Sequence, residues 1–226
     1  CCGGSHCRFR NNVATRFTSR TSFPNRQGRG VIVLLNLILG YMIGGLPTGL
    51  LLCRIVKGED PRAHGSGSTG ATNVSRVLGK KWAVLVLIID ILKGFLPVKL
   101  LVPLISPDSL AWGMLLMAVG LVAGHVWTPY AGFRGGKGVA TAAGAILGID
   151  PLALLIALSI WVLFFLPFRI VSLASMTAAI SLPFIMFILG GRPAPALIAA
   201  ILLAGFIVFT HRANIQRLIK GEEKRF

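Results

Sequence analysis

The sequence predicts an all-α polytopic membrane protein with about seven transmembrane helices, in which glycine-rich cytoplasmic loops form the candidate active site. Of its 226 residues, 54% are hydrophobic and 13% are charged, and the mean hydropathy is +0.78, values typical of integral membrane proteins. The formal net charge of +16 could suggest nucleic acid, but the basic residues lie in short loops between apolar runs. We therefore expect a multi-pass protein of the cell (inner) membrane, with the lipid bilayer and no nucleic acid as its surroundings.

Residues 1–30 differ in composition from the rest of the chain. They contain six Arg, no acidic residue and no periodic apolar pattern, which is typical of disorder. We interpret them as a disordered basic tail, a presequence or a fragment artefact, and expect activity to survive their deletion. The four cysteines show neither metal-binding spacing nor a disulfide framework. Residues 31–226 are thus expected to form one membrane domain without a metal or cofactor.

Seven apolar segments follow in order. Glycines and Pro47 interrupt the first, which favours close helix contacts and a kink. The segment 139–149 would be only about 16 Å long against a hydrocarbon core of about 30 Å, so we expect it to be tilted, half-embedded or in a thinned region. Residues 211–226 are expected to form a short basic helix along the surface. The segments are 31–53, 82–105, 109–127, 139–149, 152–168, 170–189 and 194–210.

Two opposite charges lie within the second apolar segment. Asp90 and Lys93 are three residues apart and share one face of a helix, so they can pair. Charges at this depth are expected to face protein or a cavity rather than lipid. We favour a structural ion pair over a functional one.

The distribution of basic residues predicts the orientation. Connections after the first, third, fifth and seventh segments hold 14 Lys and Arg, whereas the other connections hold only Arg192. By the positive-inside rule, the basic connections and the C-terminus are cytoplasmic.

A cationic glycine loop spans residues 132–138. Closely spaced glycines let backbone N–H groups approach a ligand, and two cations add positive charge, which together suit phosphate. These residues are Gly135, Gly136 and Gly138 with Arg134 and Lys137. The loop is not a nucleotide-binding P-loop, because position 131 is Ala and Gly138 stands where Ser or Thr would bind Mg²⁺. The alternative is a basic turn that contacts only lipid headgroups.

A second glycine-rich stretch, residues 64–76, carries hydroxyls, an amide and Arg76. Its glycines let the backbone wrap around a ligand, and a helix opening near Asn73 would favour an anion at its N-terminus. The alternative is a flexible linker. Both glycine-rich loops fall on the predicted cytoplasmic side.

Two histidines stand near these loops. His125 ends a span beside Trp127, where it is either a ligand or acid–base group or an interfacial residue. His211 and Asn214 are three residues apart on one helix face and can point into the same pocket. A basic helix bound to the membrane surface is the alternative for this last stretch.

Five short motifs follow one another in the chain: 65–79 (GSGSTGATNVSRVLG), Gly124-His125, 133–141 (FRGGKGVAT), 171–175 (VSLAS) and 211–218 (HRANIQRL). In this order they resemble the membrane acyl-phosphate:glycerol-3-phosphate acyltransferases of bacterial phospholipid synthesis, over residues 31–226. Where this family usually has Asn, the chain has Ser68, which keeps a donor but not the amide's acceptor geometry.

The resemblance implies a seven-span enzyme that moves a fatty acyl group from acyl phosphate to the 1-hydroxyl of glycerol 3-phosphate, giving lysophosphatidate and phosphate. It implies no cofactor, and we expect activity as a monomer. The catalytic residues would be Arg76, Lys137, His211 and Asn214. The substrate-binding residues would be Ser66, Gly67, Ser68, Thr69, Gly70, Asn73, His125, Arg134, Gly135, Gly136 and Gly138.

Acyl phosphate is already activated, so no covalent nucleophile is needed, and the sequence offers no Ser-His-acid arrangement. Direct attack by the glycerol hydroxyl, with cations and N–H groups stabilising the developing charge, is favoured. The proton could pass to the leaving phosphate or to His211. A transporter of organic phosphates is the main rival function, and a lipid-binding structural protein is a weaker one.

Overall fold

The computed structural model describes residues 26–225, and every regular element within them is helical. Helices of eight residues or more are α1 (Arg26–Gly44), α2 (Thr48–Lys57), α4 (Lys80–Leu96), α6 (Leu110–Val126), α7 (Val139–Ile149), α8 (Pro151–Phe168), α9 (Val171–Leu189), α10 (Ala194–Thr210) and α11 (Arg212–Ile219). Shorter ones are η1 (Pro61–Ala63), α3 (Ala71–Val77), η2 (Pro97–Leu101), α5 (Val102–Ile105), η3 (Pro107–Ser109) and η4 (Pro129–Ala131).

The first predicted span differs from the structure at its start and in its continuity. Helix α1 begins at Arg26, so the expectation of a disordered tail is wrong for residues 26–30, while residues 1–25 lie outside the described part. The predicted kink is confirmed, because the chain breaks between α1 and α2 and Pro47 precedes α2. The second predicted span corresponds to α4, η2 and α5, which follow one another without a break, close to the predicted range 82–105.

Glycines bring α1 and α6 into close contact. A Cβ on Gly44 would overlap the backbone of Leu121, and a Cβ on Gly124 would overlap the carbonyl of Tyr41. Gly40 and Gly120 meet the opposite helix in the same way. Each helix thus presents two glycines four residues apart, a pattern that lets helix backbones approach within a membrane. The predicted close packing of the first span is confirmed.

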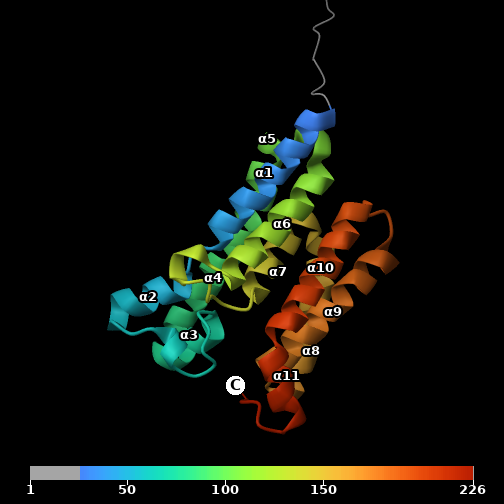
Figure 1. Cartoon of the computed structure of the whole chain (residues 1–226). Coiled ribbons are helices and arrows are strands. Elements are labelled where there is room, and N and C mark those ends of the chain that lie inside the picture. Colours follow the sequence, from blue (N-terminus) through green and yellow to red (C-terminus); the bar gives the residue numbers. More distant parts are fainter. Residues whose placement is uncertain (1–25, 226) are drawn as a thin grey trace, which may run out of the picture.

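The helices form two groups (Figure 1). Helix α1 packs on α6 and α4 packs on α7, whereas α9 packs on both α8 and α10. Contacts of α10 with α6 and of α7 with α8 join the groups. The core consists mainly of Ala, Val, Leu, Ile and Met from α6 to α10, with Val98 and Val102. Helices α2, α3 and α11 lie at the same end of the molecule, the lower end of the view, with α2 and α3 below one helix group and α11 below the other.

Within the described residues, four helical stretches are long and apolar enough to cross a membrane, and a fifth counts if α10 and α11, bent by 57°, form one span. Helix α7 has 11 residues, the short length expected from the sequence. Helix α4 carries Asp90 and Lys93, whose side chains form the predicted ion pair at 2.8 Å. Large apolar side chains such as Phe184, 65% exposed, and Ile188, 81% exposed, face outward, as expected of a bilayer-facing surface.

Residues after α10 do not form the single surface helix expected for 211–226. Helix α11 ends at Ile219, and the chain turns at Gly221, which has a φ of +72°. Hydrogen bonds from Gly221 N to Leu218 O and from Glu222 N to Arg217 O close this turn. The C-terminal residues therefore fold back toward α3, beside the gap between the two helix groups (Figure 1).

Candidate active site

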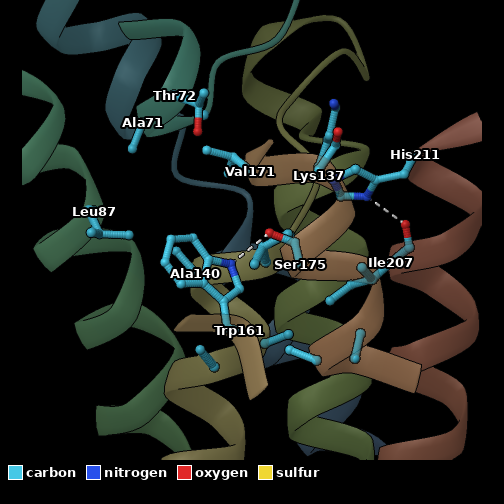
Figure 2. Close-up of a pocket in the computed structure, with 18 of the residues that line it drawn as sticks. Ala71, Thr72, Leu87, Lys137, Ala140, Trp161, Val171, Ser175, Ile207 and His211 are labelled. Carbon is cyan, nitrogen blue, oxygen red and sulfur yellow. Dashed lines mark hydrogen bonds between the residues drawn. The ribbon is translucent and has the colours of Figure 1, made fainter. Parts of the chain in front are cut away.

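A cavity of about 720 Å³ lies between α3, α4 and α7 on one side and α8 to α11 on the other. Its polar end is formed by the two glycine-rich loops and the C-terminal residues, and its apolar end by side chains of α4, α7, α8, α9 and α10. Figure 2 shows Lys137 and His211 near one end and Trp161 farther along. The volume falls in the range of small-molecule sites.

The two glycine-rich loops are joined directly. Thr69 N donates to Gly135 O at 3.4 Å. The Arg62 guanidinium donates to the Ala131 carbonyl at 2.7 Å and to the Arg134 carbonyl at 3.2 Å. The two loops, which the sequence predicted to lie on one face of the membrane, therefore form one continuous polar surface.

Within the glycine loop, Gly135 and Gly136 pack against the end of α6 instead of lining the cavity. Their N–H groups donate to the carbonyls of Val126 and His125, at 3.0 Å and 3.1 Å. A Cβ on Gly136 would overlap the His125 ring. These two N–H groups are therefore not free to bind a phosphate, which the sequence had led us to expect. Lys137 and Gly138 do line the cavity.

Lys137 is the cation of this loop that enters the cavity. Its Nζ donates to Asn214 Oδ1, and its carbonyl accepts from Thr210 Oγ1 at 3.1 Å. Burial lowers the pKa of Lys137 to about 8, an effect that Glu223 opposes and that Arg217 and Arg76 reinforce. A phosphate bound nearby would favour the charged form.

Glu223 is a site residue that sequence reasoning missed. Its carboxylate accepts from Ser172 Oγ at 2.7 Å, from Arg217 Nε at 2.7 Å and from Asn214 Nδ2. Burial alone would raise the pKa of Glu223, but these hydrogen bonds outweigh it and hold the pKa below its usual value. A signal was present, since Asn214 and Arg217 share a helix face and the Gly221 turn can return an acid to that face.

His211 is buried at the polar end, and its Nδ1 lies 2.7 Å from the Ile207 carbonyl (Figure 2). Because a carbonyl only accepts, Nδ1 carries the proton in this contact. Burial lowers the pKa of His211 to about 4, so the imidazole is neutral and Nε2 is its acceptor nitrogen. Both His211 and Asn214 line the cavity, which confirms that they face the same pocket.

Asn73 holds the first glycine-rich loop, residues 64–76, in its conformation. It is fully buried, and its Oδ1 accepts from Ser66 N at 2.9 Å. Its Nδ2 donates to the carbonyls of Pro61, His64 and Ser68, at 2.7, 3.1 and 2.8 Å. The amide is fully used by the protein, so its contribution in this structure is to fix the loop.

His125 belongs to a buried polar cluster at the wall of the cavity. Its Nδ1 lies 3.3 Å from Thr141 Oγ1 and 3.9 Å from Asp90 Oδ1. Asp90 also accepts from Thr48 Oγ1 at 3.1 Å, and the Lys93 ammonium donates to the Leu46 carbonyl at 3.0 Å. These contacts tie α2, α4, α6 and α7 together, which supports the structural interpretation of the Asp90–Lys93 pair.

The structure thus divides the predicted site residues into two sets. Those lining the cavity are Ser66, Ser68, Gly70, Arg76, His125, Lys137, Gly138, His211 and Asn214. Those near it but outside its lining are Gly67, Thr69, Asn73, Arg134, Gly135 and Gly136.

The apolar end is lined by small residues and closed by larger ones. Trp161 stands partway along, where its Nε1 donates to Ser175 Oγ at 3.2 Å (Figure 2). The small residues are Ala142, Ala143, Ala157, Ala178, Ala179 and Ala204, and the larger ones beyond them are Ile146, Leu182 and Leu203. Such a lining suits an extended apolar chain whose polar head lies at the cationic end.

Comparison with known proteins agrees with this geometry. A family model described as glycerol-3-phosphate acyltransferase matches residues 34–221. The glycerol-3-phosphate acyltransferase of Aquifex aeolicus (strain VF5) is 42% identical over 189 residues, covering 84% of this chain and 96% of the relative. That of Geotalea daltonii is 45% identical over 193 residues, with coverage of 84% and 96%. The crystal structure of PlsY, an integral membrane glycerol 3-phosphate acyltransferase, in its glycerol 3-phosphate form matches with a TM-score of 0.80 at 41% identity, covering 86% and 95% of the two chains.

Proposed function

The chain belongs to the glycerol-3-phosphate acyltransferase family of integral membrane enzymes, and we propose that it transfers a fatty acyl group from acyl phosphate to the 1-hydroxyl of glycerol 3-phosphate. The products would be lysophosphatidate and phosphate, in an early step of phospholipid synthesis. The observation that carries the proposal is one cavity with a cationic polar end and a long apolar end. Acyl phosphate has this combination of a phosphate and an apolar chain.

The polar end can bind two phosphate-bearing substrates. Arg76, Lys80, Lys137 and Arg217 line it together with the hydroxyls of Ser66 and Ser68. The cations would neutralise the phosphates, and the hydroxyls would donate hydrogen bonds. A relative of this chain has been solved in a glycerol 3-phosphate form, which supports a site for that substrate here.

The proposed reaction is a direct acyl transfer. The glycerol 1-hydroxyl oxygen attacks the carbonyl carbon of acyl phosphate, the bond from that carbon to the phosphate oxygen breaks, and phosphate leaves with the bonding electrons. His211 Nε2 is the acceptor placed to take the hydroxyl proton. Lys137 stabilises the charge that grows on the departing phosphate.

One assay tests the whole proposal. Purified protein in detergent is expected to release phosphate from acyl phosphate only when glycerol 3-phosphate is present, with lysophosphatidate formed in equal amount. A transporter of organic phosphates would require a sealed vesicle and would leave acyl phosphate intact. Phosphate release independent of glycerol 3-phosphate would contradict the proposal.

The apolar end is expected to set the acyl-chain preference. On α9, Ser172 near the mouth and Leu182 near the floor are ten residues apart, or about 15 Å along the helix axis. Replacing Ala179 with Leu adds three carbon atoms and would fill the space of about three methylenes, each worth about 0.8 kcal/mol when buried. The ratio of kcat/KM for long-chain over short-chain acyl phosphates should therefore fall roughly 50-fold.

Ile180→Phe is the matched control, because Ile180 is the next residue on α9, is 49% exposed and does not line the cavity. This variant should keep the wild-type chain-length profile. An unchanged profile for Ala179→Leu would remove the apolar end of the cavity from the acyl site. A general loss of stability would lower kcat/KM equally for all chain lengths, so it can be told apart from a change in chain-length preference.

We also propose seven spans with the C-terminus and the cavity mouth in the cytoplasm, from the bias of Lys and Arg between connections. A membrane-impermeant thiol reagent should modify a Cys at Asp108 but not a Cys at Lys224 in sealed cells. Ser106 is unsuitable for the outward probe because its side chain is 2% exposed and is bonded to Asn36 at 2.6 Å. The reverse labelling pattern would overturn the orientation.

A further inference from the structure

A second cavity, of about 570 Å³, lies at the same end of the molecule as the cavity mouth. It is bounded by α2, the segment 60–63 and the segment 130–134, and it shares no lining residue with the first cavity. The proposed reaction does not use it. Its lining includes three arginines, Arg54, Arg62 and Arg134, and one acid, Asp60.

The one acid in this lining, Asp60, accepts hydrogen bonds from Arg62. The Arg62 guanidinium donates to both carboxylate oxygens of Asp60, with Nε at 3.0 Å and Nη2 at 2.7 Å. The hydrogen bond from Arg62 lowers the pKa of Asp60 to about 2, so the acid is ionised and neutralises that one arginine. Arg54 is 3.7 Å from Asp60, and its side chain is 58% exposed. Arg134 is exposed, and no carboxylate pairs with it among residues 26–225. The three guanidiniums together carry two more positive charges than the one carboxylate can neutralise, so the cavity attracts an anion.

One aromatic residue, Tyr130, lines this basic cavity, and two more, Trp127 and Phe133, stand within three residues of it in the chain. The side chains of Tyr130 and Phe133 are 50% and 61% exposed, and Trp127 is 39% exposed. Phe133 has a φ of +59°, a left-handed conformation that is costly for a bulky residue. Exposed aromatic rings gather at membrane–water interfaces. The cavity is therefore expected to lie at the level of the lipid headgroups.

An apolar stripe on α1 continues from the cavity toward the other side of the membrane. Leu35, Ile38 and Met42 recur at helical spacing on one face of α1, and Leu46 follows just after the helix ends; each is between 42% and 59% exposed. Tyr130 connects the stripe to the cavity, because its hydroxyl lies 4.0 Å from Met42 Sδ. A cationic concavity above an exposed apolar stripe matches the shape of a phospholipid.

We propose that this surface binds one anionic phospholipid, with its phosphate between Arg54 and Arg134 and its acyl chains along the α1 stripe. Charge complementarity selects an anionic lipid over a zwitterionic one, and the stripe selects a lipid over a soluble phosphate. This lipid site adjoins the active site. Arg62 donates hydrogen bonds to the carbonyls of Ala131 and Arg134, in the same loop that carries Lys137.

Native mass spectrometry of the purified full-length protein tests this site with phosphatidylglycerol and phosphatidylcholine of identical acyl chains. Wild-type protein should retain one phosphatidylglycerol in preference to phosphatidylcholine, and added salt should weaken that retention. The double variant Arg54→Ala/Arg134→Ala should bind phosphatidylglycerol about tenfold more weakly. Arg54→Lys/Arg134→Lys should keep most of the preference because it keeps the charge.

Arg169→Ala/Arg212→Ala is the matched control, because it removes two exposed arginines that line neither cavity. It should bind phosphatidylglycerol like the wild type. Equal binding of both lipids by the wild type, or equal loss in both double-alanine variants, would overturn the proposal. Displacement of the lipid by millimolar inorganic phosphate would assign the cavity to a soluble anion and would likewise overturn it.

Discussion

Replacing Lys137 with Ala is expected to lower kcat about 100-fold or more and to change KM less. Lys137 Nζ is held by Asn214 at the polar end of the cavity, where it can stabilise charge on the phosphate as the bond to the acyl group breaks. A loss of this size corresponds to about 2.7 kcal/mol of transition-state stabilisation. Steady-state kinetics in detergent measures it.

Lys81→Ala is the matched control, since Lys81 is exposed near the start of α4 and does not line the cavity. It should leave kcat nearly unchanged. Near-wild-type turnover for Lys137→Ala, with the protein shown to be folded and inserted, would remove the glycine loop from the reaction. The loop would then be better explained as a contact with lipid headgroups.

The pKa of Lys137 adds a dependence on pH. Because the ammonium is the active form and its pKa is lowered to about 8, kcat/KM of the free enzyme should decline as pH rises through about 8. Lys137→Arg keeps a charge at every accessible pH but changes its shape. Its activity should be lower than wild type and should not decline in this range. A flat wild-type profile up to about pH 9.5 would contradict the role of the charged lysine.

Replacing Glu223 is expected to have the second largest effect. Glu223→Ala would leave Ser172, Asn214 and Arg217 without their shared acceptor, and a hydrogen bond to a charged group contributes about 1.5–3 kcal/mol. Asn214 would then hold Lys137 less firmly, so kcat/KM should fall about 100-fold. Glu223→Gln keeps one acceptor oxygen and should lose less.

Glu222→Gln tests whether position matters as well as charge. Glu222 is the adjacent acid, is exposed and does not line the cavity, so its loss should leave the kinetics unchanged. If Glu222→Gln and Glu223→Ala reduced activity equally, Glu223 would act only through the net charge of the C-terminus. A thermal unfolding midpoint for each variant separates loss of function from loss of folding.

Local sequence was enough to predict the apolar helices and the features that connect them. The 11 residues of α7, the break before Pro47 and the Asp90–Lys93 pair all depend on residues close together in the chain. The spacing of His211 and Asn214 likewise predicted a shared pocket, and both line the cavity, although His211 stands at the bend between α10 and α11 and not on a face of one helix. The boundary at Arg26 was missed because the composition of residues 26–30 resembles the tail, whereas the structure continues α1 through them.

The sequence by itself indicated which residues could carry the chemistry, since glycines stand beside lysine, histidine and amide side chains in short stretches of the chain. Only the tertiary structure decided what each of them contacts. Asn73 is used entirely by its own loop, and Gly136 makes room for the His125 ring. Glu223 reaches Ser172 from 51 residues away along the chain. Such partners are chosen by how helices pack and where the chain turns back, because hydrogen bonds between distant segments leave no regular spacing in a single sequence.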